Sequence, residues 1–236
     1  MTDAASTRNP APPIARWSAL ASLAIVIPAP SIGALASFWL FPGPIGLVTY
    51  AVCKAVLYLT PALWSRFVDG EPWSWSPPRK GGFGIGIGLG LLIGALIWAV
   101  YLVLGERAID VSIFREVLDK NGLSTPMRFL VAAAWLSFVN ALLEEYVFRW
   151  FITTRFAAVA PRAAIGLSAA AFTLHHVIVL LKYLPVPSTI LASAGIFVGG
   201  LLWSWLYRRS DSVWPPYVSH AIVDLAVMGV GYWALM

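Results

Sequence analysis

Long apolar runs dominate the chain, and the short segments between them hold most of the charged residues. The runs are continuous and do not alternate apolar and polar residues over about ten positions, as the strands of a membrane β-barrel do. A helix needs about 20 mostly apolar residues to cross a bilayer. The runs that meet this requirement are Ser18–Phe41, Gly46–Trp64, Gly82–Leu104, Met127–Phe151, Ala163–Leu181, Ser188–Tyr207 and Val213–Met236.

The predicted fold is therefore all-α, a polytopic transmembrane helix bundle of about seven spans, within a range of roughly six to eight. The range reflects Pro28 and Pro30, which can split or kink the first span. A proline inside a span is tolerated where neighbouring groups satisfy the carbonyl that it frees. Pro42 and Pro44 leave room for only a tight turn before the second span.

The composition supports a membrane protein. Of the 236 residues, 59% are hydrophobic and 11% are charged, whereas a soluble domain is about 45–50% apolar and about 25% charged. The net charge of +5 does not indicate nucleic-acid binding, because the basic residues are scattered between the spans and serve as loop anchors. The single cysteine, Cys53, excludes an internal disulfide and a multi-cysteine metal site.

Three regions are predicted along the chain. Residues 1–16 form a disordered N-terminal tail, 17–126 the N-terminal transmembrane helices and loops, and 127–236 a C-terminal core of transmembrane helices. More Lys and Arg residues fall on the side of the N-terminus than on the other side, which favours a cytoplasmic N-terminus. The expected location is the inner membrane of a bacterium, with the lipid bilayer as a partner and the oligomeric state open.

Glycines recur along the third predicted span, which indicates close packing of helix backbones. A phosphate-binding loop is disfavoured because no Gly-Lys-Ser/Thr follows them. These glycines are Gly82, Gly84, Gly86, Gly88, Gly90 and Gly94.

Three predicted spans carry ionisable residues where lipid is expected. An ionised side chain at the bilayer centre costs about 2.5–3.5 kcal/mol, so such residues usually face a protein interior or a wet cavity. Several of them together suggest a reaction site inside the membrane protein. The three motifs are Glu144-Glu145-x-x-x-Arg149, Phe172-x-x-x-His176 and His220-x-x-x-Asp224.

The first motif offers a division of roles between two neighbouring carboxylates. Glu145 and Arg149 are four residues apart and lie on nearly the same helix face, in the favoured orientation for an ion pair. Glu144 points about 100° away, so it is less well placed for the arginine and can serve as a general base. An ion pair at a helix end, at the membrane surface, is an equally open interpretation.

The histidine motifs are individually ambiguous. His176 shares a face with Phe172, and His175 lies about 100° further round, where it is either a supporting or a lipid-facing residue. His220 and Asp224, one turn apart, can share a water, a metal or an oxyanion, or Asp224 can fix a histidine tautomer. A polar pair that packs two helices together is the alternative.

The order of these motifs resembles the CPBP family of intramembrane proteases, the CAAX prenyl endopeptidase and bacteriocin-processing or ABI family. The matching segments read EEYVFR, FTLHH and HAIVD, and the resemblance covers roughly Met127–Met236. It implies an intramembrane endopeptidase that acts on a membrane-associated peptide or protein, such as a lipidated tail, a leader or a sorting tail.

The resemblance also implies roles for the residues. Glu144 would activate water with help from His176, and His220 with Asp224 would stabilise the oxyanion or form a second polar pair. Glu145 and Arg149 would hold the helix geometry. Asp224 stands where the family most often has Asn, and a carboxylate donates no hydrogen bond unless it is protonated.

A glutamate mechanism without a cofactor is favoured, because the H-E-x-x-H pattern of zinc proteases is absent from the sequence. Zinc remains possible, with Glu144, His176 and His220 as ligands. Two other functions stay open: a non-catalytic scaffold or immunity-type peptide-binding protein of the same fold, and a small proton-coupled transporter. Lys54, inside the second span, fits none of them specifically and either snorkels or pairs with a carboxylate.

Overall fold

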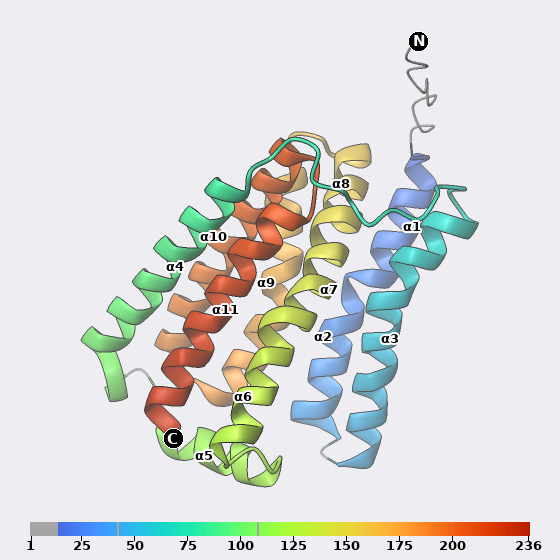
Figure 1. The fold of residues 1–236 in the computed structure, drawn as a ribbon. Helices are drawn as coiled ribbons and strands as arrows, with labels where there is room; N and C mark the ends of the chain where they lie inside the picture. Colours follow the sequence, from blue (N-terminus) through green and yellow to red (C-terminus); the bar gives the residue numbers. More distant parts are fainter. Residues whose placement is uncertain (1–13, 42, 108) are drawn as a thin grey trace.

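A computed structural model describes residues 14–41, 43–107 and 109–236 of the chain, and these residues are helical with short connections and no strand (Figure 1). The predicted disordered tail lies almost entirely outside the described residues. Within these described residues, seven helices are long and apolar enough to cross a membrane, as predicted from the sequence.

The first span runs from Arg16 to Leu40 and is not split by its prolines. It consists of α1 (Arg16–Val26), α2 (Pro28–Leu35) and the π-helical segment η1 (Ala36–Leu40). Ile27, between α1 and α2, keeps helical backbone angles of φ −65° and ψ −45°, so the helix continues through this point.

The remaining helices follow in chain order. Most are joined by short segments, but residues 68–82 form a longer connection between α3 and α4. The second and third spans are α3 (Pro44–Phe67) and α4 (Phe83–Leu104), and after them come the short η2 (Gly105–Arg107) and α5 (Val111–Lys120). The fourth span comprises α6 (Pro126–Ala134), η3 (Trp135–Asn140), α7 (Ala141–Glu145), η4 (Tyr146–Thr153) and α8 (Thr154–Val159). The last three spans are α9 (Ala164–Tyr183), α10 (Val186–Ser210) and α11 (Trp214–Leu235).

The fourth span is longer than predicted. It ends at Val159 rather than Phe151 and holds 34 residues. The predicted span ends before Arg155, because a charged side chain in a lipid-facing helix is costly. Instead, its side chain is 2% exposed, pairs with Asp69 and lies 4.1 Å from the centroid of the Phe151 ring. A buried, paired arginine does not end a helix.

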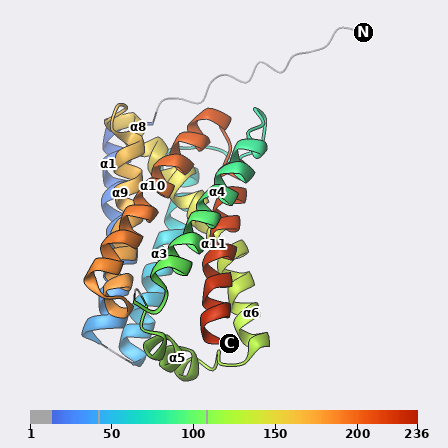
Figure 2. The same cartoon turned by 90° about the vertical axis from the view of Figure 1, so that its left-hand side faces the viewer.

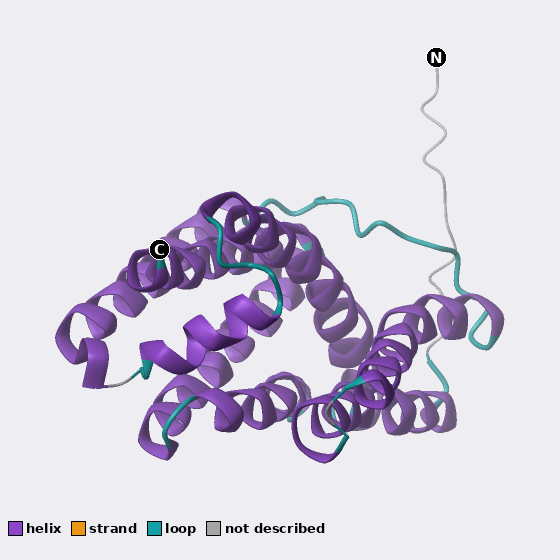
Figure 3. Ribbon diagram, turned by 90° about the horizontal axis from the view of Figure 1, so that it is seen from below, coloured by secondary structure: helices purple, strands orange, loops and turns teal. Residues whose placement is uncertain are grey.

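Helix α5 lies across one end of the bundle, at the end where the chain terminates (Figures 1 and 3). Asp110 caps it by accepting hydrogen bonds from the backbone N–H of Ser112 at 3.0 Å and from its hydroxyl at 2.6 Å. These bonds lower the pKa of the Asp110 carboxyl. No residue of α5 is buried, which is typical of a helix that lies at a membrane interface.

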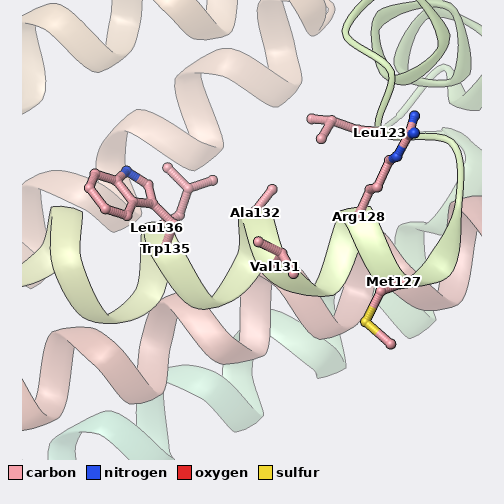
Figure 4. Close-up of a pocket in the computed structure, with 7 residues that line it drawn as sticks. All are labelled: Leu123, Met127, Arg128, Val131, Ala132, Trp135 and Leu136. Carbon is pink, nitrogen blue, oxygen red and sulfur yellow. The ribbon is translucent and has the colours of Figure 1, made fainter.

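A groove of about 550 Å³ lies on the exposed side of α6 (Figure 4). Arg128 is the only charged residue that lines it, and the others are apolar. The lining residues are Leu123, Met127, Arg128, Val131, Ala132, Trp135 and Leu136. Because its lining contains none of the ionisable motif residues, the groove is not the reaction site.

Helices α4 and α11 lie side by side along their length (Figures 1 and 2). Glycines allow this approach: a Cβ at Gly90 would lie 2.9 Å from the Ile222 Cβ and 3.0 Å from the Ser219 carbonyl oxygen. Gly86 and Gly94 also face α11, whereas nothing lies within 4 Å of a Cβ at Gly88. The predicted small-residue packing is therefore present on one face of α4, and it sets the position of α11.

We expect Gly90→Val to lower the stability of the detergent-solubilised protein by about 1–3 kcal/mol, because the new side chain would overlap α11. Gly88→Val is the matched control, since it makes the same change on the open face of the same helix. Thermal unfolding of both variants is the measurement. Equal loss of stability in the two variants would contradict this packing.

Candidate active site

The three sequence motifs come together inside the bundle. Glu144 and Glu145 lie on α7, His176 on α9, and His220 on α11. Glu144 is 5% exposed, Glu145 is fully buried and His220 is 4% exposed. Asp224 lies one turn beyond His220 with its side chain 26% exposed, at the edge of the cluster.

The interpretation of Glu145 and Arg149 as an ion pair at the membrane surface is wrong. The Arg149 side chain is fully buried, and the helix continues for ten residues beyond it to Val159. Arg149 Nε donates to Glu145 Oε2 at 3.1 Å, as the four-residue spacing predicted. The guanidinium carbon lies 4.8 Å from the ring centroid of Phe172 and 5.5 Å from that of Trp203. The pair is an interior feature packed between aromatic rings.

The second oxygen of Glu145 is bound to α11. Its Oε1 lies 2.9 Å from His220 Nδ1. A carboxylate accepts hydrogen bonds, so this contact places a proton on Nδ1 and directs Nε2 to the other side of the ring. His220 Nε2 lies 3.9 Å from Glu144 Oε2 and 3.6 Å from Asp224 Oδ1. Glu145 therefore orients His220, a role that the sequence had left open to Asp224.

An aromatic wall fixes the plane of the His220 ring. The Trp203 ring stacks on it with centroids 4.2 Å apart and an interplanar angle of 16°. The Trp203 indole N–H donates to the Ser219 hydroxyl at 3.0 Å, which holds the tryptophan in place. Phe172 meets the same imidazole edge-on at 5.8 Å. His220 is thus held by one hydrogen bond and two rings.

His176 is oriented by its own helix. Its Nδ1 lies 2.8 Å from the Phe172 carbonyl oxygen, which can only accept, so Nδ1 donates and Nε2 is left without a proton in the neutral ring. The Phe172 ring lies 4.6 Å from the imidazole. The sequence spacing predicted that the Phe172 ring shares a helix face with His176. The structure shows that the Phe172 carbonyl group also binds this histidine.

His175 is buried at 7% exposure, so the lipid-facing alternative is wrong. Its ring stacks on Phe148 with centroids 5.6 Å apart, and its Nδ1 has no hydrogen-bond partner among the described residues. Ligand atoms of Glu144, His175 and His176 all lie within 4.8 Å of one another. This set is compatible with zinc ligation and contains His175 where the sequence suggested His220.

Several contributors to the site carry no motif of their own. Both Trp203 and Ser204 lie on α10. Trp203 stacks on His220, and the Ser204 hydroxyl accepts from Arg149 Nη1 at 3.5 Å. The π-helical segments η3 and η4 flank α7 on both sides. Such wide turns often occur at functional sites, and no residue pattern in this sequence announced them.

The arrangement defines a membrane-embedded cluster of two carboxylates and two histidines that could activate water. Residues 126–226 match the family model described as type II CAAX prenyl endopeptidase Rce1-like. The match contains all three motifs and confirms the resemblance seen in the sequence; residues before 126 lie outside it. No curated protein and no solved structure matches the chain.

Arg149→Met should destabilise the protein by about 3–5 kcal/mol, because it leaves the buried Glu145 carboxylate without its cation. The double variant Arg149→Met/Glu145→Gln should recover part of that loss, since the uncompensated charge is then gone. Thermal unfolding is the measurement. Lys120→Met, which breaks the exposed pair with Glu116, is the control. No recovery in the double variant would contradict the assigned ion pair.

Proposed function

We propose that the protein is an intramembrane endopeptidase that hydrolyses a peptide bond of a membrane-associated substrate with water activated by Glu144. The observation that carries the proposal is the placement of Glu144: it is buried, and its carboxylate lies 3.9 Å from His220 Nε2 and within 4.8 Å of a ring nitrogen of His176, on two other spans. The match of residues 126–226 to the Rce1-like family supports the same reaction class.

Of the two neighbouring carboxylates, Glu144 is the one available to act as the general base. Both oxygens of Glu145 are engaged, by Arg149 and by His220. Glu144 accepts a proton from water while the water oxygen attacks the carbonyl carbon of the substrate. His176 Nε2 assists by accepting a hydrogen bond from the same water. When the tetrahedral intermediate collapses, the C–N bond breaks and Glu144 returns the proton to the leaving amine.

His220 stabilises the oxyanion of that intermediate. It acts as the imidazolium: its Nδ1–H donates to Glu145, and a second proton on Nε2, which faces the carboxylates of Glu144 and Asp224, donates to the oxyanion. Asp224 acts through His220, because its Oδ1 lies 3.6 Å from Nε2 and an ionised carboxylate donates no hydrogen bond itself. An Asp is therefore compatible with a position where the family most often has Asn.

A metal is the alternative source of an activated water. Glu144, His175 and His176 would hold a zinc ion, which would lower the pKa of its bound water and polarise the substrate carbonyl. His176 Nδ1 is already committed to Phe172, so only its Nε2 is open to such an ion. We favour the glutamate mechanism, in which the same residues act directly.

The substrate that we propose is a peptide with a prenylated C-terminal tail. The matched family is described as CAAX prenyl endopeptidase, and a lipid group would hold such a tail at the membrane. A leader or a sorting tail anchored in the same way is the related possibility. We place the protein in the bacterial inner membrane with a cytoplasmic N-terminus, because more positive residues flank that side.

Glu144→Gln should abolish cleavage while the protein remains folded, because the amide keeps the size of the side chain but cannot take a proton from water. The assay uses a farnesylated, internally quenched peptide with a C-terminal CAAX tail. Membrane proteins of cells that carry either form are also compared for processing. Glu116→Gln, on the exposed face of α5, is the control. Full processing by Glu144→Gln would rule out this mechanism, and proton-linked flux in liposomes would favour a transporter instead.

Removal of divalent metal should leave the cleavage rate unchanged if the glutamate mechanism is right. The purified protein is dialysed against a zinc chelator, analysed for metal content and assayed on the same peptide. A loss of activity that added zinc restores would instead assign the reaction to a zinc-activated water. His175→Phe would then lose metal as well as activity.

A further inference from the structure

Lys54 lies in the middle of α3, in a span that precedes the region matched by the family model. Its ammonium nitrogen does not lie free at a membrane surface. It lies 3.1 Å from the Tyr58 hydroxyl, and 5.6 and 5.2 Å from the ring centroids of Tyr50 and Tyr58. Two aromatic faces and a hydroxyl therefore hold a cation inside a transmembrane helix.

The hydroxyl of Tyr58 connects this cation to the fourth span. It lies 3.0 Å from Asn140 Oδ1. Asn140 precedes Glu144 by four residues, so both side chains lie on the same face of their helix. Hydrogen bonds thus connect Lys54, Tyr58 and Asn140 across two helices, and the helical spacing places the Asn140 side chain beside Glu144.

The direction of the hydrogen bonds follows from the chemistry of the groups. An ammonium only donates, so the Tyr58 oxygen accepts from Lys54 and the Tyr58 hydrogen goes to Asn140 Oδ1. The Asn140 oxygen is then occupied from the Tyr58 side, and its NH₂ group is the part left to donate to Glu144. The two observed bonds therefore run in one direction, from Lys54 toward the fourth span, and hydrogen bonds aligned in this way polarise one another.

Glu144 has no arginine of its own, because Arg149 is bound to Glu145. We propose that Lys54, acting through Tyr58 and Asn140, is a positioning residue for Glu144. The chain holds one face of the carboxylate, so that its other lone pairs face the water and the His176 imidazole. This inference rests on the proposed function for its effect on catalysis, but the chain itself is measurable without a substrate.

Four variants distinguish the effect of the Lys54–Tyr58–Asn140 connection from that of the surrounding packing. Tyr58→Phe removes only the bridging hydroxyl, and Lys54→Met removes the charge but keeps an unbranched apolar side chain. Lys54→Arg restores the charge. Tyr50→Phe is the matched control, because its ring also faces the ammonium but its hydroxyl takes no part in the chain.

The first readout is the infrared carboxylate band of Glu144 at one fixed pH. It is isolated in each background by subtracting the spectrum of the corresponding Glu144→Gln protein. We expect Tyr58→Phe and Lys54→Met to shift this band, and Tyr50→Phe to leave it in place. An unshifted band in the first two variants would overturn the proposal, whatever the cleavage assay shows.

The second readout is cleavage of the farnesylated peptide. Tyr58→Phe and Lys54→Met should each lower kcat about tenfold with KM within about twofold, because a misplaced carboxylate affects the reaction rather than binding. Lys54→Arg should recover part of kcat. The double variant Lys54→Met/Tyr58→Phe should have the same kcat as Tyr58→Phe alone, since one break already interrupts the chain.

The outcomes distinguish the two proposals. If the losses of kcat in the two single variants add up in the double variant, and the unfolding temperature falls in parallel, Lys54 has a purely structural role and the positioning proposal is overturned. A band that shifts in Tyr58→Phe and Lys54→Met, found together with a wild-type protein that cleaves nothing, would support the chain and reject the protease. Normal cleavage with an unshifted band in Tyr58→Phe and Lys54→Met would reject the chain and leave the protease intact.

Discussion

The Glu145 carboxylate is the group on which the arrangement of the bundle depends. It is fully buried, and its two oxygens bind Arg149 on its own helix and His220 on α11. Removing a charge from water costs several kcal/mol unless partners repay it, so this carboxylate tolerates little relative movement of the helices around it. The Arg149 guanidinium extends the link to Ser204 on α10. The Glu145–Arg149 pair therefore joins the fourth, sixth and seventh spans.

This constraint explains how two adjacent glutamates acquire different roles. Glu145 is held on both oxygens and is unable to approach a substrate without breaking the core of the bundle. Glu144 faces imidazoles and a polar chain from α3 instead, in a space shared by three helices. The difference arises from the direction in which each side chain leaves the helix, since the two residues are chemically identical.

Helical periodicity was enough to predict the spans and the Glu145–Arg149 pair, because both depend on spacing within one segment. The close packing of the glycine face of α4 was predictable from the sequence for the same reason. The contact of His220 with Glu145, the burial of His175 and the connection of Lys54 to Glu144 depend on which helices are neighbours, and spacing within a helix does not contain that information. The extra length of the fourth span was missed because Asp69, the partner of Arg155, lies 86 residues earlier in the chain.

The two π-helical segments around α7 have a consequence for how this sequence should be aligned with others. A wide turn of this kind accommodates one residue more than the α-helical path, and η3 ends about one turn of helix before the glutamates. A protein lacking one residue between Trp135 and Asn140 would return to the narrower path, and its carboxylates would face about 100° away from the histidines. A single-residue gap at this place in an alignment would thus mark proteins that have the acidic motif in their sequence but do not direct its carboxylates at the histidines.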